Sequence, residues 1–249
     1  MRIDIISLFP AMFAGPFGDS ITKRAVAAGL LDIHILNPRQ FAYDRHKQVD
    51  DAPFGGGSGM VLKPEPFARA LSYIRRNTRF TKRRVILLGP GGTVFNQERA
   101  KTLAAYEQII LLCGHYEGFD DRVPSQLVDE ELSIGDYVLT GGELPAMVVT
   151  DAVSRMIPGV LGSEESAPTD SFYDGILGFP QYTRPREYQG TPVPEVLISG
   201  DHAKIDAWRR EEALRRTWQR RPELLAQAPL SENDRRTLER IKAEENSGL

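Results

Sequence analysis

Acidic residues and glycines gather in one stretch of the chain, between residues 109 and 145. Two apolar runs, 109–113 and 134–139, are each followed by glycine. Glycine after a buried strand lets a ligand lie against bare backbone. Between Gly114 and Leu139 there is one base, Arg122, against seven acids: Glu117, Asp120, Asp121, Asp129, Glu130, Glu131 and Asp136. The stretch therefore predicts a pocket that favours a cationic ligand over a phosphate.

A third apolar run, 85–88, leads into Gly89-Pro90-Gly91-Gly92 and then a helical pattern over 96–106. Ligands of α/β proteins collect at the carboxyl ends of parallel strands, so we expect the three strand ends to meet at one site. A dinucleotide fingerprint would need glycine where Val94 stands, which argues against a Rossmann pyrophosphate site. An adenosine-type ligand held by main-chain groups fits better, and S-adenosylmethionine, with its sulfonium and amino groups, meets this description.

The acidic residues between 117 and 131 and the glycine-rich segment 40–60 each allow more than one interpretation. For 129–131 we prefer a solvated acidic face, whereas Glu117, between Tyr116 and Gly118, is the better candidate for a functional acid. The segment 40–60 lacks periodicity and contains three consecutive glycines, which is typical of a mobile surface loop or of a functional one. No lysine follows these glycines, so a Walker-type triphosphate site is not predicted.

Composition limits the class of protein. The 249 residues are 41% apolar and 26% charged, which suits a globular chain with one large domain, or one medium and one small. The single cysteine, Cys113, excludes an internal disulfide and a multi-cysteine zinc site, and His46 and His115 have no chelating spacing, so we expect no dedicated metal site. The apolar runs are too short for a membrane span and the N-terminus resembles a strand, so we predict a cytoplasmic protein without membrane contact.

The order of patterns predicts a parallel α/β sheet. A strand over 2–9, a helix over 19–28 and a strand over 31–36 begin it, and an amphipathic helix carries Phe67, Ala70, Leu71 and Ile74. We expect a first domain over 1–160, a linker over 161–194 that is rich in proline and glycine, and a small helical domain over 195–249.

Basic clusters lie at 75–84 and in the last domain. The net charge of −3 conceals them, and each fits either a solvated helix face or contact with nucleic acid. The helix expected over 203–218 has one apolar stripe, with Ile205 and Trp208 on roughly the other side; the stripe consists of Ala203, Ala207, Leu214 and Trp218.

Six motifs in collinear order resemble the bacterial tRNA (guanine-N1)-methyltransferase family, the TrmD type of the SPOUT superfamily. They are DDAPFGGGSGM at 50–60, GHYEGFDDR at 114–122, SIGDYVLTGGELP at 133–145, DAVSRMIPGVLG at 151–162, DSFYDG at 170–175 and YTRP at 182–185. The resemblance extends over essentially the whole chain. This chain departs from the family pattern at Ser58, where proline is expected, and at 89–91, where serine and glutamine are common.

The resemblance implies transfer of the S-adenosylmethionine methyl group to N1 of guanine 37 of tRNA, 3′ of the anticodon. It also implies a SPOUT domain with a deep trefoil knot near 86–140, a homodimer, and use of Mg²⁺, for which the sequence has no dedicated cage. The implied cofactor residues are Leu88, Gly89, Pro90, Gly114, Tyr116, Glu117, Ile134, Gly135, Asp136, Tyr137, Val138, Leu139, Gly141, Gly142 and Pro145.

The same resemblance assigns residues to the tRNA and to catalysis. Gly59 and Met60 would approach the target guanine, and the other expected substrate residues are His46, Asp50, Arg215 and Arg220. Asp170 is assigned as the base that removes the N1 proton of guanine, and Arg155 as the cation that stabilises charge on O6. Two alternatives stay open, a non-catalytic RNA-binding protein of the same fold and an α/β enzyme that uses another nucleotide.

Overall fold

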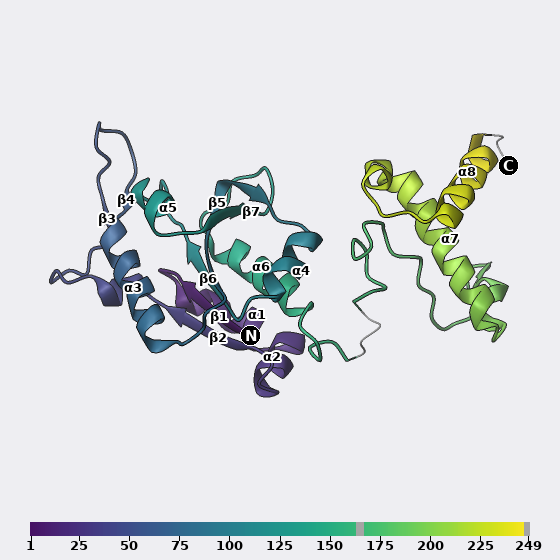
Figure 1. The fold of residues 1–249 in the computed structure, drawn as a ribbon, viewed down its shortest axis with the longest axis horizontal. Helices are drawn as coiled ribbons and strands as arrows, with labels where there is room; N and C mark the ends of the chain where they lie inside the picture. The colour runs from purple at the N-terminus through teal and green to yellow at the C-terminus, as the bar shows by residue number, and fades with distance from the viewer. Residues whose placement is uncertain (163–166, 247–249) are drawn as a thin grey trace. The chain divides into compact units, whose positions relative to one another are not determined.

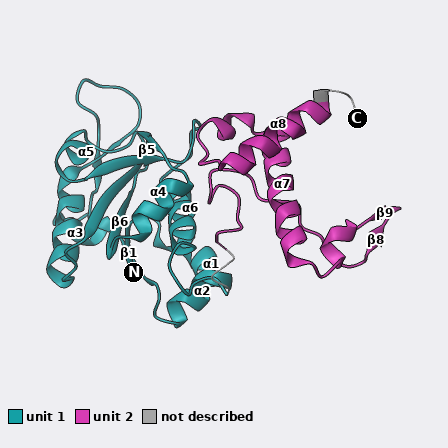
Figure 2. Cartoon of the chain, turned by 45° about the vertical axis from the view of Figure 1, so that its right-hand side comes forward, with its two compact units in different colours: residues 1–164 teal, residues 165–249 magenta. Residues whose placement is uncertain are grey.

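The structure is a computed structural model that describes residues 1–162 and 167–246 (Figure 1). The chain divides into two compact units, Met1–Glu164 and Glu165–Leu249 (Figure 2). The division falls inside the segment 161–194, which we predicted to be a linker. Residues of that segment contribute to the core of the second unit, where Ile176 is buried.

Unit 1 is built on a five-stranded sheet in the order β2-β1-β6-β5-β7, with every pair parallel. The strands are β1 (Arg2–Ile6), β2 (Asp32–Leu36), β5 (Arg83–Val94), β6 (Gln108–Cys113) and β7 (Glu130–Ser133). A separate antiparallel pair joins β3 (Asp50–Asp51) to β4 (Val61–Leu62). The predicted parallel α/β sheet is confirmed.

Helices cover both faces of this sheet (Figure 2). Alternate residues of β6 enter two cores: Ile109 and Leu111 pack with residues of α4 and α6, whereas Ile110 and Leu112 pack with α3. A strand buried on both faces reads as a continuous apolar run, as 109–113 does. The helical elements of unit 1 are η1 (Pro10–Phe13), α1 (Ala14–Phe17), α2 (Ser20–Ala27), η2 (Pro38–Phe41), α3 (Pro64–Asn77), α4 (Gln97–Ala104), α5 (Arg122–Gln126) and α6 (Glu143–Ser154).

The strand predicted over 134–139 is wrong. The last strand of the sheet, β7, ends at Ser133, and 134–139 form a loop in which Val138 is 94% exposed. The acidic face predicted at 129–131 is also corrected at Glu130, which lies in β7 and pairs with Arg84 and Arg99. Strand β5 continues through the glycine turn 89–92, and its register against β7 shifts between Leu88 and Thr93.

Unit 2 is mainly helical. Its elements are β8 (Glu187–Tyr188), β9 (Thr191–Pro192), η3 (Glu195–Ile198), α7 (His202–Arg220), η4 (Pro222–Ala226) and α8 (Glu232–Asn246). The core combines Ile176, Ala213, Leu214 and Ile241. Of the predicted stripe on α7, Leu214 is buried and Trp218 packs on this core, but Ala203 and Ala207 are exposed because the core lies against the C-terminal half of the helix.

Within the described residues, the structure has no helix whose length and apolar composition would suffice to cross a membrane.

Candidate active site

Loops at the carboxyl ends of β6 and β7, together with the glycine turn in β5, enclose a cavity of about 380 Å³ in unit 1. All of the predicted cofactor residues line it except Asp136, which is exposed in the loop after β7. Ten further lining residues were not predicted: Leu87, His115, Gly118, Phe119, Asp121, Pro124, Glu131, Leu132, Ser133 and Thr140. Six of them lie inside the motifs 114–122 and 133–145: His115, Gly118, Phe119, Asp121, Ser133 and Thr140.

Glycines allow the two main loops to approach each other closely. The Gly142 N–H donates to the Gly114 carbonyl at 2.9 Å, and a Cβ atom at Gly142 would lie 2.6 Å from Cys113 Cα. A Cβ atom at Gly141 would lie 2.9 Å from His115 Nδ1, a buried atom that has no hydrogen-bond partner among the described residues. The cavity wall at this point is therefore main chain and can offer backbone donors and acceptors to a ligand.

The cavity wall is acidic. Three carboxylates, those of Glu117, Asp121 and Glu131, belong to it, and the lining residues that the structure describes include neither lysine nor arginine. Tyr116 lies next to Glu117 with a positive φ of 59°, a conformation that costs energy for a residue with a side chain. Such a wall disfavours phosphate and attracts a cation.

The glycine-rich loop, residues 52–60 between β3 and β4, lies against the same wall of the cavity. The Glu117 N–H donates to the Met60 carbonyl at 3.0 Å, and two further backbone bonds of 2.9 Å join Leu62 to Gly118 and to Asp120. A Cβ atom at Gly59 would lie 2.3 Å from Glu117 Oε1. The predicted substrate residues Gly59 and Met60 thus lie beside the cavity, which periodicity could not indicate.

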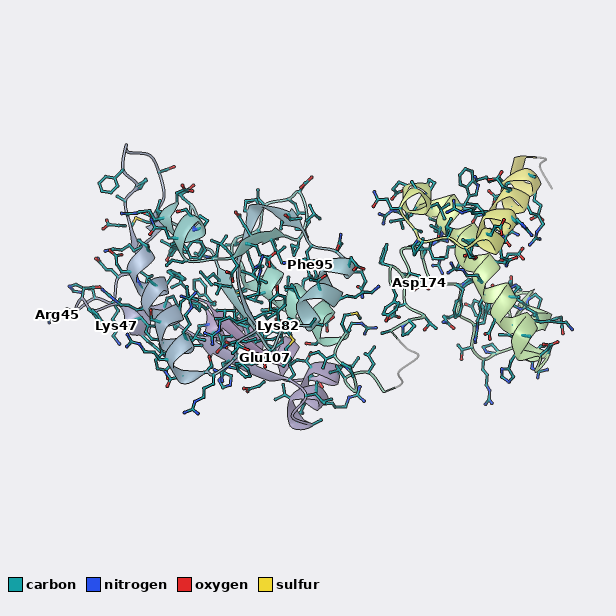
Figure 3. All side chains as sticks on the ribbon, in the orientation of Figure 1. Arg45, Lys47, Lys82, Phe95, Glu107 and Asp174 are labelled. Carbon is teal, nitrogen blue, oxygen red and sulfur yellow. The ribbon has the colours of Figure 1, made fainter. Side chains whose placement is uncertain are left out.

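The other two predicted substrate residues of unit 1, His46 and Asp50, precede this loop in the sequence. Asp50 is in β3 opposite Leu62, at the base of the glycine-rich loop. His46 is exposed, its N–H donates to Asp44 Oδ1 at 2.9 Å, and its neighbours Arg45 and Lys47 project from the protein (Figure 3).

The two predicted catalytic residues belong to different units. Arg155 ends α6 in unit 1, where its N–H donates to the Asp151 carbonyl at 3.1 Å. Asp170 is exposed in a turn of unit 2 and lines a second cavity, of about 220 Å³, together with Arg209 and Arg210.

The two predicted tRNA-binding arginines of α7 differ in their surroundings. The Arg215 guanidinium is half-buried and pairs with Glu211 at 3.1 Å, Glu244 at 3.2 Å and Glu212 at 3.3 Å. Arg220 is exposed at the end of α7. Arg220 therefore presents its charge to solvent, whereas Arg215 already serves contacts within unit 2.

The described residues contain no group of three or more histidine, cysteine, aspartate or glutamate side chains arranged to hold a metal ion. They therefore offer no protein cage for Mg²⁺, and we derive no step through that ion.

Comparison with known proteins adds the decisive observation. The family model described as tRNA (Guanine-1)-methyltransferase TrmD matches residues 1–227. The chain belongs to this family. Curated relatives named tRNA (guanine-N(1)-)-methyltransferase are similar along nearly their whole length: a protein of Dehalococcoides mccartyi strain CBDB1 is 54% identical over 247 residues, covering 99% of each chain. One of Staphylococcus epidermidis (strain RP62A) is 55% identical over 242 residues, covering 97% of this chain and 98% of its own.

Membership in the tRNA (Guanine-1)-methyltransferase family confirms the resemblance that the six motifs indicated. The family match spans unit 1 entirely and extends through α7 of unit 2. Both the acidic cavity and the residues predicted for catalysis therefore fall within the matched region.

Proposed function

We propose that this protein transfers the methyl group of S-adenosylmethionine to N1 of guanine 37 in tRNA, immediately 3′ of the anticodon. The family supports a tRNA guanine-N1 methyltransferase. The structural observation that carries the proposal is the acidic, glycine-walled cavity at the carboxyl ends of β6 and β7.

The cavity fits the methyl donor in chemistry and size. A volume of about 380 Å³ is within the range for small-molecule sites, and main-chain groups near Gly114 and Gly142 suit an adenosine moiety. Glu117, Asp121 and Glu131 complement the positive sulfonium. When bound there, S-adenosylmethionine supplies an electrophilic methyl group.

Guanine needs help from the protein before its N1 can react, because N1 carries a proton. Asp170 would remove that proton as the N1 lone pair forms the new bond to the methyl carbon and the old carbon–sulfur bond electrons pass to sulfur. Negative charge then develops on O6, which the Arg155 guanidinium would stabilise. Arg155 belongs to unit 1 and Asp170 to unit 2, so the proposed reaction uses residues of both units.

A homodimer is part of the proposal. The outer face of α6 exposes Leu144 (50%) and Val148 (46%), four residues apart, while the opposite face of the helix is buried in unit 1. An apolar stripe on a helix whose other face is already packed favours a second protein surface. Arg155 ends the same helix, so dimer formation would fix the position of a proposed catalytic residue.

Two finer assignments complete the proposal. A deep trefoil knot over 86–140 agrees with a sheet in which β5 lies between β6 and β7, although β6 and β7 follow β5 in the chain. A cytoplasmic location agrees with a tRNA substrate.

The test is methyl transfer from S-adenosylmethionine carrying a radiolabelled methyl group to tRNA transcripts with G or A at position 37. We expect label on the G37 transcript alone. Asp170→Ala should lower the transfer rate by about 100-fold or more and change the dissociation constant of S-adenosylmethionine less than about twofold, because a general base acts in the transition state. Equal labelling of A37, or equal loss of binding and rate in the variant, would overturn the assignment.

A further inference from the structure

The two glutamates that begin β7 have opposite surroundings. Glu130 pairs with Arg84 at 3.0 Å and also with Arg99 of α4. Successive side chains of a strand point to opposite faces, and Glu131 accordingly lines the cavity. Within the described residues, the Glu131 carboxylate has neither a hydrogen bond nor an ion pair. One glutamate thus holds the sheet to a helix, and its neighbour presents an unneutralised charge to the ligand.

The Glu131 carboxylate lies against two glycines of the turn in β5. A Cβ atom at Gly89 would lie 2.3 Å from Glu131 Oε1, and one at Gly91 would lie 3.4 Å from both carboxylate oxygens. The register shift after Leu88 places this glycine turn under the side chain. Glycine at 89 leaves room for the carboxylate where it lies, and a side chain there would displace the flexible end of Glu131.

The charge of Glu131 lies in the acidic wall of the cavity. The side chain is half-buried, and no lysine or arginine lines the cavity among the described residues. A charge beside a low-dielectric wall interacts more strongly with a cation than a fully solvated charge does. In S-adenosylmethionine, the charge that changes during methyl transfer is that of the sulfonium.

We propose that Glu131 is a specificity-determining residue for the methyl donor, because its carboxylate favours the sulfonium of S-adenosylmethionine over the neutral thioether of the product S-adenosylhomocysteine. The inference depends on the proposed function, which places both molecules in this cavity. The two molecules share the adenosine and amino-acid parts and differ in the methyl group and the charge on sulfur. Glu131 would therefore strengthen substrate binding relative to product binding and lessen inhibition by the product.

The test measures the dissociation constants of S-adenosylmethionine and S-adenosylhomocysteine by calorimetry for the full chain and for Glu131→Gln. Glutamine keeps the shape and removes the charge. We expect the preference for S-adenosylmethionine over S-adenosylhomocysteine to fall at least about fivefold in the variant. Glu131→Asp, which restores the charge on a shorter side chain, should recover part of the preference.

The matched control is Glu98→Gln, which removes a carboxylate with an 80% exposed side chain on α4. It should leave the preference unchanged, and thermal unfolding should show that each variant folds. An unchanged preference in Glu131→Gln, or an equal weakening of both ligands, overturns the role of Glu131. If the unaltered chain binds neither ligand, the proposed function itself fails, so the two failures are distinguishable.

Discussion

Gly142 has no room for a side chain, because a Cβ atom would lie 2.6 Å from Cys113 Cα and 2.9 Å from Gly114 N. These are backbone atoms at the end of a buried strand, and they cannot move aside without disturbing the sheet. We expect Gly142→Ala to lower the free energy of unfolding by about 1–3 kcal/mol, as overpacking does. It should also weaken S-adenosylmethionine binding at least about tenfold. Denaturant unfolding and calorimetry measure the two effects.

Gly15→Ala is the control for this substitution. A Cβ atom at Gly15 meets nothing within 4 Å, so the free energy of unfolding should change by less than about 0.5 kcal/mol. Wild-type cofactor affinity in Gly142→Ala would show that the close approach of the two loops does not shape the binding site.

At the residue scale, the sequence predicted the main-chain part of the candidate site better than its charges. Gly114 could be chosen because glycine after a buried strand has a structural meaning of its own, whereas Gly142 follows a loop and was predicted through the motif 133–145. Glu131 could not be distinguished from Glu130, since three consecutive acids have no periodicity that says which one is paired. Only the position of β7 in the sheet separates the paired carboxylate from the one that lines the cavity.

Several ion pairs join helices α7 and α8, and the one between Arg210 and Asp234 is bidentate. Arg210 donates from Nε and Nη2 to the two carboxylate oxygens of Asp234 at 2.8 and 2.9 Å. This guanidinium, with Ser231, holds the pKa of Asp234 well below its usual range. A carboxyl group whose pKa is lowered by folding stabilises the folded state above its unfolded pKa of about 4, and this contribution is lost as the pH falls further.

We therefore expect Asp234→Asn to destabilise unit 2 by about 2 kcal/mol at pH 7 and by clearly less at about pH 2, because the contribution of the ion pair is lost between the unfolded pKa and the lower pKa of the folded state. Trp208 and Trp218 both lie on α7, so tryptophan fluorescence during urea unfolding reports on unit 2. Asp206→Asn removes a carboxylate that is 71% exposed and serves as the control, with little effect at either pH. A destabilisation that is the same at both pH values would contradict the role of the ion pair.

The arginines of α7 make a second prediction at this scale. Arg220 is exposed, whereas Arg215 pairs with three glutamates, so Arg220→Ala should lower the slope of log affinity for tRNA against log salt by about one. Arg215→Ala should act mainly on the stability of unit 2. Filter binding between about 50 and 200 mM salt measures the slope, and an unchanged slope in Arg220→Ala would remove that residue from the tRNA-binding surface.

The sequence predicted the elements that are buried within the protein, but it did not predict the exposed loop that lines the cavity. The run 109–113 became β6 because both of its faces meet helices. The run 134–139, which Gly135 and Asp136 interrupt, forms a cavity loop instead, where Tyr137 is 56% exposed. Apolar composition predicts burial without saying what buries the residues. We attribute the wrong prediction of a strand to apolar side chains that contact a ligand or a second protein surface instead of the core.

At the scale of the whole molecule, the outer face of α6 should control assembly. Val148→Lys places a charge in the proposed dimer interface without touching the core of unit 1, since Val148 is 46% exposed. We expect the mass measured by light scattering to halve while circular dichroism stays unchanged, and methyl transfer to fall with the mass. Val26→Lys is the control, because Val26 is also on a helix and is 42% exposed. A Val148→Lys protein of unchanged mass would show that this face does not form the interface.

The backbone bonds between 60–62 and 117–120 make the glycine-rich loop and one wall of the cavity a single piece of structure. If guanine approaches Gly59 and the methyl donor lies beside Glu117, each ligand contacts the same piece. The first ligand to bind orders this piece, and the second ligand then binds with a smaller loss of conformational entropy. Binding should then be cooperative, and thermodynamic linkage requires that tRNA tighten the methyl donor by the same factor as the methyl donor tightens tRNA.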